Sequence, residues 1–535
     1  MKISFFFIKT SLFVLLLGAF LLPGKYSFWP EFHQAASAVA IAIVFSIPLF
    51  FKRQVNLNFS TLFLILTGTL IAIDLFIGRE NFSAFNFYGL LYLLSAIVVS
   101  LYVSNEGEND FLNIFSLAMI LISLISFLLQ IYQVTGWGEG YQLIINQFQI
   151  ADNRSYANIG QPNLLGTIYV VSIVLSMLSF SQKKINIYIF YALIFSFSLG
   201  IYLTASRVAM LSLILLAVFI IFQEKFKINI ISIAMPLALL IIFFAKILGP
   251  YLFFLEDREL ISSNISNGRF EIWSISIELI KKKWLFGYGF NRVGLANFSA
   301  VDEFHALTGT FVTQSHNIFL DFLIWFGVPV GIILSLVFVF VFFKLVIDNF
   351  LFEDKNFIYL SSFPIFIHSL FEYPLYYQNF LVVISIIIGL SKNRKTFKIN
   401  SYLVKLIVIV FIFFSFQCFY EMKTLEIDLL DQKLYANRIY GAENKKPKNI
   451  IYADLIEEHI ALMAFRDDRD INENVIKRME DFSKYYLVPR NIYLIVNFYK
   501  DKKDKKMFEF WRKRAEIFLP PIYKNYYKNL KLQQE

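Results

Sequence analysis

The sequence predicts an all-α protein: a polytopic membrane helical bundle of about 13 spans, with an extramembrane loop that carries helices and a C-terminal extramembrane helical domain. Two observations predict this fold class. Hydrophobic residues make up 57% of the 535 residues and charged residues only 17%, against about 25% charged residues in ordinary soluble domains. Apolar runs of about 20 residues, each enough to cross a bilayer, recur along most of the chain.

The first apolar run is expected to be a retained helix rather than a removed signal peptide. The stretch that follows it reads "PGKYSFWP", which lacks a small-residue cleavage site. Hydropathy places the other spans in turn along the chain. The predicted spans are residues 8–23, 32–51, 59–78, 85–104, 111–134, 163–181, 185–203, 207–223, 228–247, 316–343, 357–371, 376–391 and 402–420.

Basic residues in the short loops predict the orientation. With the N-terminus in the cytoplasm, the inner loops hold Lys52 and Arg53, Lys183 and Lys184, and the stretch "KNRKTFK" at 392–398. The loop "NEGEND" at 105–110 carries no basic residue and fits this orientation poorly. An odd number of spans then places the C-terminus outside.

This orientation puts four polar stretches on the same, outer face. They come from separate parts of the chain, so one site built from all four is geometrically possible. The stretches are "NIGQPN" (158–163), "TASR" (204–207), the long loop 248–315 that ends at "QSHN", and "FEYPLYYQNF" (371–380).

The predicted segments outside the membrane also contain helices. Residues 269–284 have apolar side chains at helical spacing, which suits an amphipathic helix at the membrane interface, and Gly287 and Gly289 end it. The tail shows helical periodicity at 455–465 and 507–519, with a loop at 443–449. The expected domains are 1–247 (spans one to nine), 248–315 (loop), 316–420 (spans ten to thirteen) and 421–535 (helical domain).

Four charged or titratable residues at the predicted outer face are candidates for function. Arginine near hydrocarbon is costly and usually faces a polar cavity or a partner. Arg207 can instead simply reach lipid headgroups, with Glu372 as its partner, and Arg269 can be a solvated loop residue. His316, at the start of a span, can simply hydrogen-bond the backbone.

Several classes of function lack their usual motifs. The single cysteine, Cys418, provides no disulfide framework. No His-x-x-His pair, cysteine cluster or paired aspartate offers a metal site, and no Gly-Lys-Thr phosphate loop is present. We therefore expect no metal, no cofactor and no nucleic-acid partner.

The succession of "GQPN", "TASR", "GRFEIW", "SHNIFLDFLIWFGVPVG" and "HSLFEYPLYYQNF" resembles the bacterial protein O-oligosaccharyltransferases of the O-antigen ligase and polymerase superfamily. The resemblance covers nearly the whole chain. The stretch "GRFEIW…LFGYGFN…SHN" is shared by the wider superfamily, whereas "NIGQPN" and "HSLFEYPLYY" followed by an extramembrane tail are typical of the protein-glycosylating branch. Leu164 stands where that branch often has His.

The resemblance implies a multi-pass protein of the bacterial inner membrane with its active site on the periplasmic face. It implies en bloc transfer of a preassembled glycan from undecaprenyl diphosphate to a Ser or Thr hydroxyl of an acceptor protein such as type IV pilin. It also implies that no nucleotide sugar and no metal are required. The loop 248–315 and the C-terminal domain are then periplasmic.

The residue types suit this chemistry. A diphosphate leaving group needs a cation, and arginine binds phosphate oxygens in pairs, which makes Arg207 and Arg269 catalytic candidates. His316 is the candidate general base for the acceptor hydroxyl, or instead a group that orients a substrate. The candidate substrate-binding residues are Gln161, Asn163, Glu372, Tyr373, Tyr376 and Tyr377.

Purely structural roles are the alternative for these substrate-binding candidates. Pro162 and Asn163 can form the turn and the cap before a helix, and the tyrosines can form an aromatic belt. Alternative functions are an O-antigen ligase acting on lipid A–core, an O-antigen polymerase, and a lipid-linked glycan transporter. A transporter predicts functional charges spread through the spans, whereas these cluster on one face.

Overall fold

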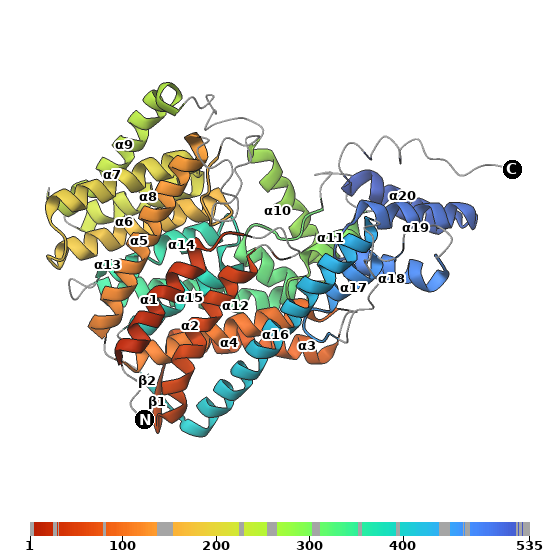
Figure 1. Ribbon diagram of the computed structural model, residues 1–535, viewed down its shortest axis with the longest axis horizontal. Coiled ribbons are helices and arrows are strands. Elements are labelled where there is room, and N and C mark those ends of the chain that lie inside the picture. The colour runs from red at the N-terminus through yellow and green to blue at the C-terminus, as the bar shows by residue number, and fades with distance from the viewer. Residues whose placement is uncertain are drawn as a thin grey trace. The chain divides into compact units, whose positions relative to one another are not determined.

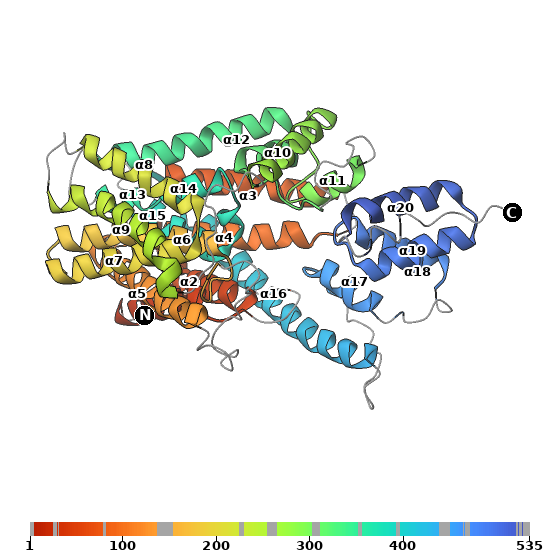
Figure 2. The same ribbon diagram turned by 90° about the horizontal axis from the view of Figure 1, so that it is seen from above.

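The protein is represented by a computed structural model (Figures 1 and 2). It describes residues 5–24, 29, 31–78, 82–106, 108–135, 154–223, 229–253, 265–301, 311–350, 356–391, 396–437, 450–463, 465, 471–519, 523 and 527. The predicted loop 443–449 and the basic residues at 392–395 lie outside this set.

The all-α fold class is confirmed, and each of the 13 predicted runs corresponds to a helix or to a pair of short helices. Among the described residues, nine helices are long and apolar enough to cross a membrane, and four apolar segments are shorter. The helices that carry these segments are α1 (Phe5–Leu21), α2 (Phe32–Phe51), α3 (Phe59–Ile77), α4 (Ala84–Ser104), α5 (Glu108–Thr135), α6 (Pro162–Ser181), α7 (Ile187–Thr204), α8 (Arg207–Gln223), α9 (Ile230–Phe253), α12 (Ile318–Phe350), α13 (Asn356–Leu360), α14 (Phe363–Ser369), α15 (Gln378–Leu390) and α16 (Ser401–Ala436).

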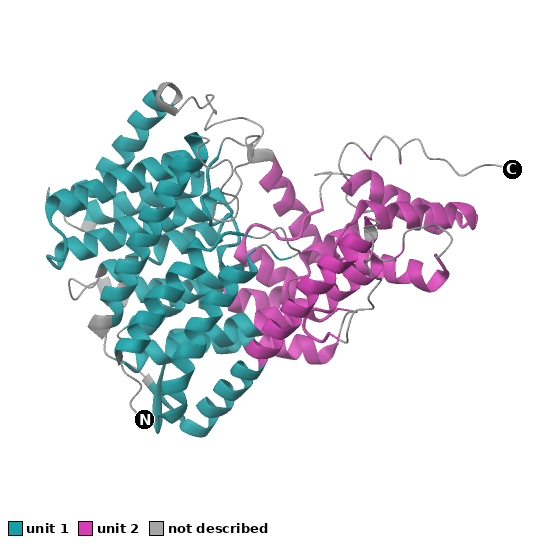
Figure 3. Cartoon of the chain, in the orientation of Figure 1, with its two compact units in different colours: residues 1–68, 91–262, 336–413 teal, residues 69–90, 263–335, 414–535 magenta. Residues whose placement is uncertain are grey.

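The chain forms two compact units, which Figure 3 colours separately. Unit 1 comprises residues 1–68, 91–262 and 336–413, and unit 2 comprises 69–90, 263–335 and 414–535. Each unit gathers segments from distant parts of the sequence. The four consecutive domains expected from hydropathy therefore stay a prediction about membrane topology rather than a description of these units.

Helix α6 is the central element of unit 1. It is buried along nearly its whole length and packs against α5, α7, α8, α13 and α14. Pro162 occupies its first turn, where a missing backbone N–H costs nothing. The next helix, α7, is capped by Asn186, whose side chain accepts a 2.9 Å hydrogen bond from the backbone N–H of Ile189.

One end of unit 1 carries two short strands, β1 (Gln54–Asn58) and β2 (Thr396–Asn400), which pair antiparallel (Figure 1). At this strand end, Lys52 forms an ion pair of 2.7 Å with Glu106. Three loops that were predicted to be inner, near 52–58, 105–106 and 396–400, therefore share this end. Lys52 also provides the partner for the acidic loop that fitted the charge rule poorly.

The opposite end of unit 1 gathers the loops that were predicted to be outer. Asn158 accepts a hydrogen bond from Gln34 through its backbone carbonyl (2.6 Å) and donates through its side chain to the carbonyl of Leu21 (2.8 Å). The start of α2, the end of α1 and the segment before α6 are thereby joined. This end is called the polar end below.

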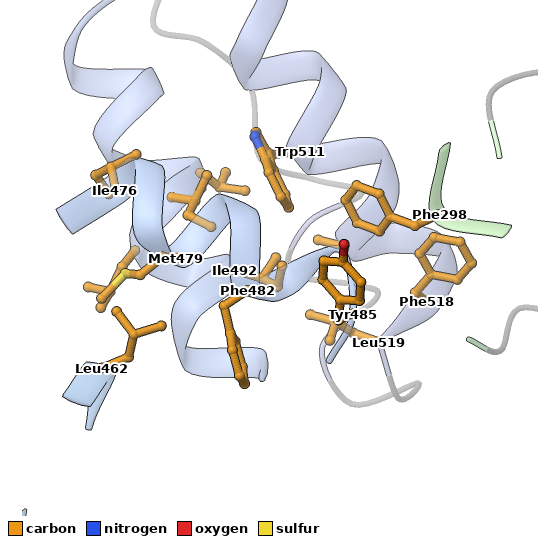
Figure 4. Close-up of a cluster of buried hydrophobic side chains, with 14 of the residues drawn as sticks. Phe298, Leu462, Ile476, Met479, Phe482, Tyr485, Ile492, Trp511, Phe518 and Leu519 are labelled. Carbon is orange, nitrogen blue, oxygen red and sulfur yellow. The ribbon is translucent and has the colours of Figure 1, made fainter. Parts of the chain in front are cut away.

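Unit 2 contains α10 (Ile265–Lys282), α11 (Val293–Ala300) and the tail helices α17 (Asp454–Leu462), α18 (Glu473–Ser483), α19 (Pro489–Asp501) and α20 (Lys505–Phe518). The helices predicted at 269–284, 455–465 and 507–519 are thus present. Asn472 and Asp504 cap α18 and α20 through hydrogen bonds to backbone N–H groups. Figure 4 shows the buried core of this region, in which Trp511 and Phe518 pack against Phe298 of α11.

Three features differ from the predicted elements. The span predicted at 357–371 is two helices, α13 and α14, and a short 3₁₀ helix, η2 (Pro374–Tyr376), follows them. Helix α12 changes direction at Gly327, which has φ 79° and ψ 171°. Helix α16 continues to Ala436, 16 residues beyond the predicted end of the span at 420, because the sequence turns polar there without a helix-breaking residue.

Candidate functional site

A chain of polar contacts crosses the polar end of unit 1. The guanidinium of Arg154 donates from Nη2 to Oδ1 of Asn163 at 2.6 Å, and Nδ2 of Asn163 donates to Oε1 of Glu372 at 3.3 Å. Asn163 and Glu372 are buried, with 9% and 6% of their surfaces exposed. One basic and one acidic side chain are thus joined by one amide that hydrogen-bonds to both, and this set is called the Arg154 cluster below.

Arg154 also contacts the turn that introduces Arg207. Its Nε donates to the carbonyl of Thr204 at 2.9 Å, and Ala205 follows in the left-handed conformation with φ 47°. This turn lets α7 end and α8 begin within two residues. Arg207 is the first residue of α8, and its side chain is exposed.

A close helix contact holds that turn near Asn163. A Cβ placed on Gly166 would lie 2.9 Å from the Cβ atoms of both Ser206 and Ala209. Gly166 therefore lets α6 and α8 approach closely, one helical turn from Asn163. Two predicted stretches, "GQPN" and "TASR", are consequently neighbours.

Asn163 does not cap α6. The cap position is Gln161, whose side chain makes no capping hydrogen bond, and Asn163 lies one residue inside the helix after Pro162. Its side chain instead serves the Arg154 cluster. The alternative in which Asn163 is only a helix cap is therefore wrong, whereas Gln161 lies half-buried at the helix start.

The aromatic turn after α14 borders Glu372. The rings of Tyr373 and Tyr377 stack with centroids 6.1 Å apart, and Tyr376 meets Tyr373 edge-on at 5.7 Å. All three side chains are partly exposed. Burial raises the pKa of the Tyr373 hydroxyl, and the carboxylates of Glu372 and Glu31 raise it further, so this hydroxyl stays protonated and can donate a hydrogen bond.

His368, which was predicted to be a residue of the span, is a core histidine. It is fully buried, and its Nδ1 lies 2.8 Å from the hydroxyl of Thr167 on α6. Its contact ties α14 to α6 directly beneath the residues that carry Asn163 and Glu372.

In unit 2, His316 is held in a strained conformation two residues before the start of α12. Its φ is 56°, which costs a residue with a side chain roughly 1–2 kcal/mol. Its neighbours fix it there. The carboxylate of buried Asp321 accepts from the hydroxyl of Ser315 at 2.6 Å, and the side chain of Asn317 accepts from the backbone N–H of Phe319 at 2.9 Å.

Such strain persists where the surroundings determine it, and it gathers at functional sites. Asn317 is the residue that caps α12, since its side chain accepts hydrogen bonds from the backbone N–H groups of Phe319 and Leu320. His316 is half-buried, and hydrogen bonds of its neighbours Ser315 and Asn317 fix the backbone on both sides.

Arg269 lies in the second turn of α10, the helix predicted to be amphipathic. Part of the apolar surface of that helix faces outward, since Phe270 and Ile277 are exposed while Leu279 is buried, and Trp284, just beyond the helix end, is exposed as well. Exposed apolar side chains on a helix that a tryptophan follows suit a helix at a lipid surface. Arg269 is half-buried at the start of this helix.

Arg154 was not among the candidate residues predicted from the sequence, and its contacts emerge only in the structure. The signal available in the sequence was an arginine four residues before the start of the "NIGQPN" stretch. Across the residues that the structure describes, no three His, Cys, Asp or Glu side chains come together to hold a metal ion.

Comparison with known proteins supports a transferase. Residues 191–335, which include Arg207, Arg269 and His316, match a family model described as O-Antigen ligase, and residues 357–438 match one described as Virulence factor membrane-bound polymerase, C-terminal. The chain is 25% identical to the ComP-specific O-oligosaccharyltransferase of Acinetobacter baylyi over 70% of this chain and 68% of that protein.

A second relative gives the same indication. The chain is 22% identical to the General O-oligosaccharyltransferase of Acinetobacter baylyi over 55% of this chain and 53% of that protein. These matches confirm the resemblance drawn from the motifs. They support glycan transfer to protein as the general activity of this multi-pass membrane protein.

Proposed function

We propose that this chain transfers a preassembled glycan en bloc from undecaprenyl diphosphate to Ser or Thr hydroxyls of periplasmic acceptor proteins such as a type IV pilin. The proposal includes a location in the bacterial inner membrane with the reaction on the periplasmic face. One observation carries it. An arginine, a buried amide and a buried carboxylate form a single hydrogen-bonded cluster at the polar end, beside the turn that presents Arg207.

In this proposal the arginines stabilise the leaving group. The bond between the sugar and the diphosphate breaks, and negative charge develops on the lipid diphosphate. Preorganised cations aimed at such charge usually supply the largest catalytic contribution, and guanidinium groups bind phosphate oxygens in pairs. We assign this role to Arg207 and Arg269, with Arg154 as a further cation that Asn163 holds in position.

His316 acts on the acceptor. An alcohol is a weak nucleophile, and a positioned base typically contributes about 10²–10⁴-fold. The imidazole accepts the proton of the Ser or Thr hydroxyl as its oxygen bonds to the sugar carbon. An orienting role for His316 is the alternative, and both roles use the fixed backbone conformation observed at this residue.

Gln161, Asn163 and Glu372 are assigned to the glycan or the acceptor peptide, because amides and a carboxylate beside stacked rings suit polar, flat-faced sugars. Tyr373, Tyr376 and Tyr377 supply the rings. Glu372 is partly engaged by Asn163, which fixes its orientation before a substrate binds.

The test is to express the chain in cells that carry a lipid-linked glycan and a candidate pilin, and to weigh the intact pilin. The proposal predicts a mass increase equal to the glycan, and its loss on replacing Arg207 or His316 with Ala. Arg478→Ala is the matched control, because Arg478 forms an exposed ion pair with Glu458 in the tail, and we expect normal transfer. An unmodified pilin in cells whose lipid A–core gains the glycan would overturn the proposal.

That outcome corresponds to the second candidate, an O-antigen ligase that acts on lipid A–core. The match of residues 191–335 to the O-Antigen ligase model favours it. The two candidates share donor and chemistry and differ in the acceptor. A change in neither pilin nor lipid A–core would favour the transporter alternative.

A further inference from the structure

A buried ion pair lies outside the residues assigned above. Nη1 of Arg292 contacts Oδ2 of Asp74 at 3.3 Å, and Nη2 of Arg292 donates to Oδ1 of Asn86 at 3.1 Å. Asn86 in turn donates from Nδ2 to the same Asp74 oxygen at 2.8 Å. The three residues come from the end of α3, the start of α4 and the turn before α11, and each is at most 4% exposed.

The ion pair also fixes the backbone of the turn between α10 and α11, residues 283–292. Asp74 Oδ2 accepts a hydrogen bond from the backbone N–H of Phe290 at 3.1 Å. The Phe290 ring packs edge-on against Trp325 of α12, with centroids 4.7 Å apart. On its other side, a Cβ on Gly89 would lie 2.4 Å from this ring, so Phe290 is inserted between α4 and α12.

A second set of contacts attaches the same turn to the bend in α12. The N–H groups of Tyr288 and Gly289 donate to the carbonyls of Ile324 and Trp325 at 2.8 and 2.9 Å, and the N–H of Val328 donates to the carbonyl of Trp284 at 2.6 Å. The bend at Gly327 frees these α12 carbonyls and this N–H from intrahelical bonding. The turn therefore completes the hydrogen bonding of α12.

Two glycines of the turn, Gly287 and Gly289, show how closely its backbone approaches α12 and the ion pair. A Cβ on Gly287 would lie 2.5 Å from the carbonyl oxygens of both Ile324 and Trp325, and one on Gly289 would lie 2.2 Å from Nη1 of Arg292. Both glycines also have positive φ, 65° and 102°. No other residue fits either position without moving a backbone or the buried ion pair.

The turn at residues 283–292 lies between Arg269 and His316 along the chain. Arg269 is carried by α10, which runs directly into the turn, and His316 stands two residues before α12, which receives the turn. We infer that Asp74, Asn86 and Arg292 act as a brace that fixes the distance between Arg269 and His316. They are positioning residues for the proposed glycan transfer, and the inference rests on that proposed function.

A brace has a consequence that a merely stabilising ion pair lacks. Loosening it changes the spacing of two groups that must act together, and a misplacement of about 1 Å can cost about 10²-fold in rate. Substrate affinity, which depends on other contacts, is retained. We therefore expect Asp74→Asn to lower kcat about 10²-fold with an unchanged KM for the acceptor.

The distance itself can be measured. Spin labels at Gly268→Cys and Thr313→Cys report on the two elements, since both positions are exposed and a side chain at Gly268 meets no atom within 4 Å. The only native cysteine, Cys418, is replaced by Ser. Double electron–electron resonance on the purified full chain should give a narrow distance distribution, and Asp74→Asn should broaden it.

Two further variants separate positioning from folding. Asp74→Asn with Arg292→Gln removes both charges, so no uncompensated charge remains buried, and we expect normal thermal unfolding with a broadened distribution and lowered kcat. Should Asp74→Asn not fold, Arg292→Lys keeps the charge but cannot bond Asp74 and Asn86 together, and it should broaden the distribution. Glu458→Gln, at an exposed ion pair, should change neither quantity.

A folded Asp74→Asn variant with wild-type spacing overturns the inference, and so does one that broadens the spacing while kcat is unchanged. A wild-type protein that transfers no glycan overturns the proposed function instead. In that case the spacing measurement still decides whether the brace exists, so the two failures are distinguishable.

Discussion

Replacing Asn163 with Leu tests the Arg154 cluster most directly, because this one amide serves both a cation and a carboxylate. A hydrogen bond to a charged group contributes about 1.5–3 kcal/mol. The 2.6 Å contact with Arg154 belongs at the upper end of this range and the 3.3 Å contact with Glu372 at the lower end. The sum, about 4–5 kcal/mol, is an upper limit.

The loss in stability should be smaller than this limit. Arg154 keeps its hydrogen bond to the carbonyl of Thr204, and its half-buried side chain can reach water. We expect the free energy of unfolding to fall by about 2 kcal/mol. Glycan transfer should fall further, by about 10²-fold, because the cation and the carboxylate are then no longer held in position.

The assay is the fraction of acceptor pilin that carries the glycan, measured by intact mass at matched enzyme levels, with thermal unfolding recorded in parallel. Ser172→Ala is the matched control. Ser172 lies on the same helix and forms buried hydrogen bonds with Ser123 and Met119, but it lies nine residues from Asn163. Normal transfer by Asn163→Leu, or an equal loss in Ser172→Ala, would refute the reasoning.

Two more predictions concern unit 2. Gly327→Ala should unfold α12 locally and lower the thermal midpoint, because its Cβ would lie 2.4 Å from the carbonyl oxygen of Leu285, whereas Gly268→Ala should be neutral; equal midpoints would contradict the close approach. Burial, and then the charge of Lys433, lower the pKa of His459 to about 4, so the neutral form is favoured in the fold. Stability of the tail helices should therefore fall by up to about 3 kcal/mol as the pH drops from about 6.5 to 4, as measured by hydrogen exchange, and His459→Phe should abolish this dependence.

Hydropathy predicted the spans well because a lipid-facing helix must be apolar along its whole length. It failed where long-range contacts decide the backbone. The bend in α12 depends on hydrogen bonds from a turn some 40 residues earlier in the chain, and no local periodicity encodes them. The extension of α16 to Ala436 was missed for another reason. Hydropathy identifies apolar segments that can lie in lipid, and the last part of α16 is helical but polar.

The candidate residues show the same limit. The motifs identified Asn163 and Glu372, but their contact joins positions 209 residues apart, and Arg154 gained significance only through its partners. Asp74 offered a signal that was not used. It is an acidic residue within the apolar run "TLIAIDLFI", and such residues usually have a buried partner, which here is Arg292.

The carboxylate of Asp454 connects the tail to the start of α4. Asp454 begins α17 and at the same time accepts hydrogen bonds from the backbone N–H groups of Ser83 and Ala84, at 2.6 and 3.1 Å, where α4 begins. Cutting the tail away therefore uncaps α4. Chimaeras that graft the tail of one such protein onto another must exchange the residues around 82–85 with it, because these residues and the tail pack and hydrogen-bond to each other.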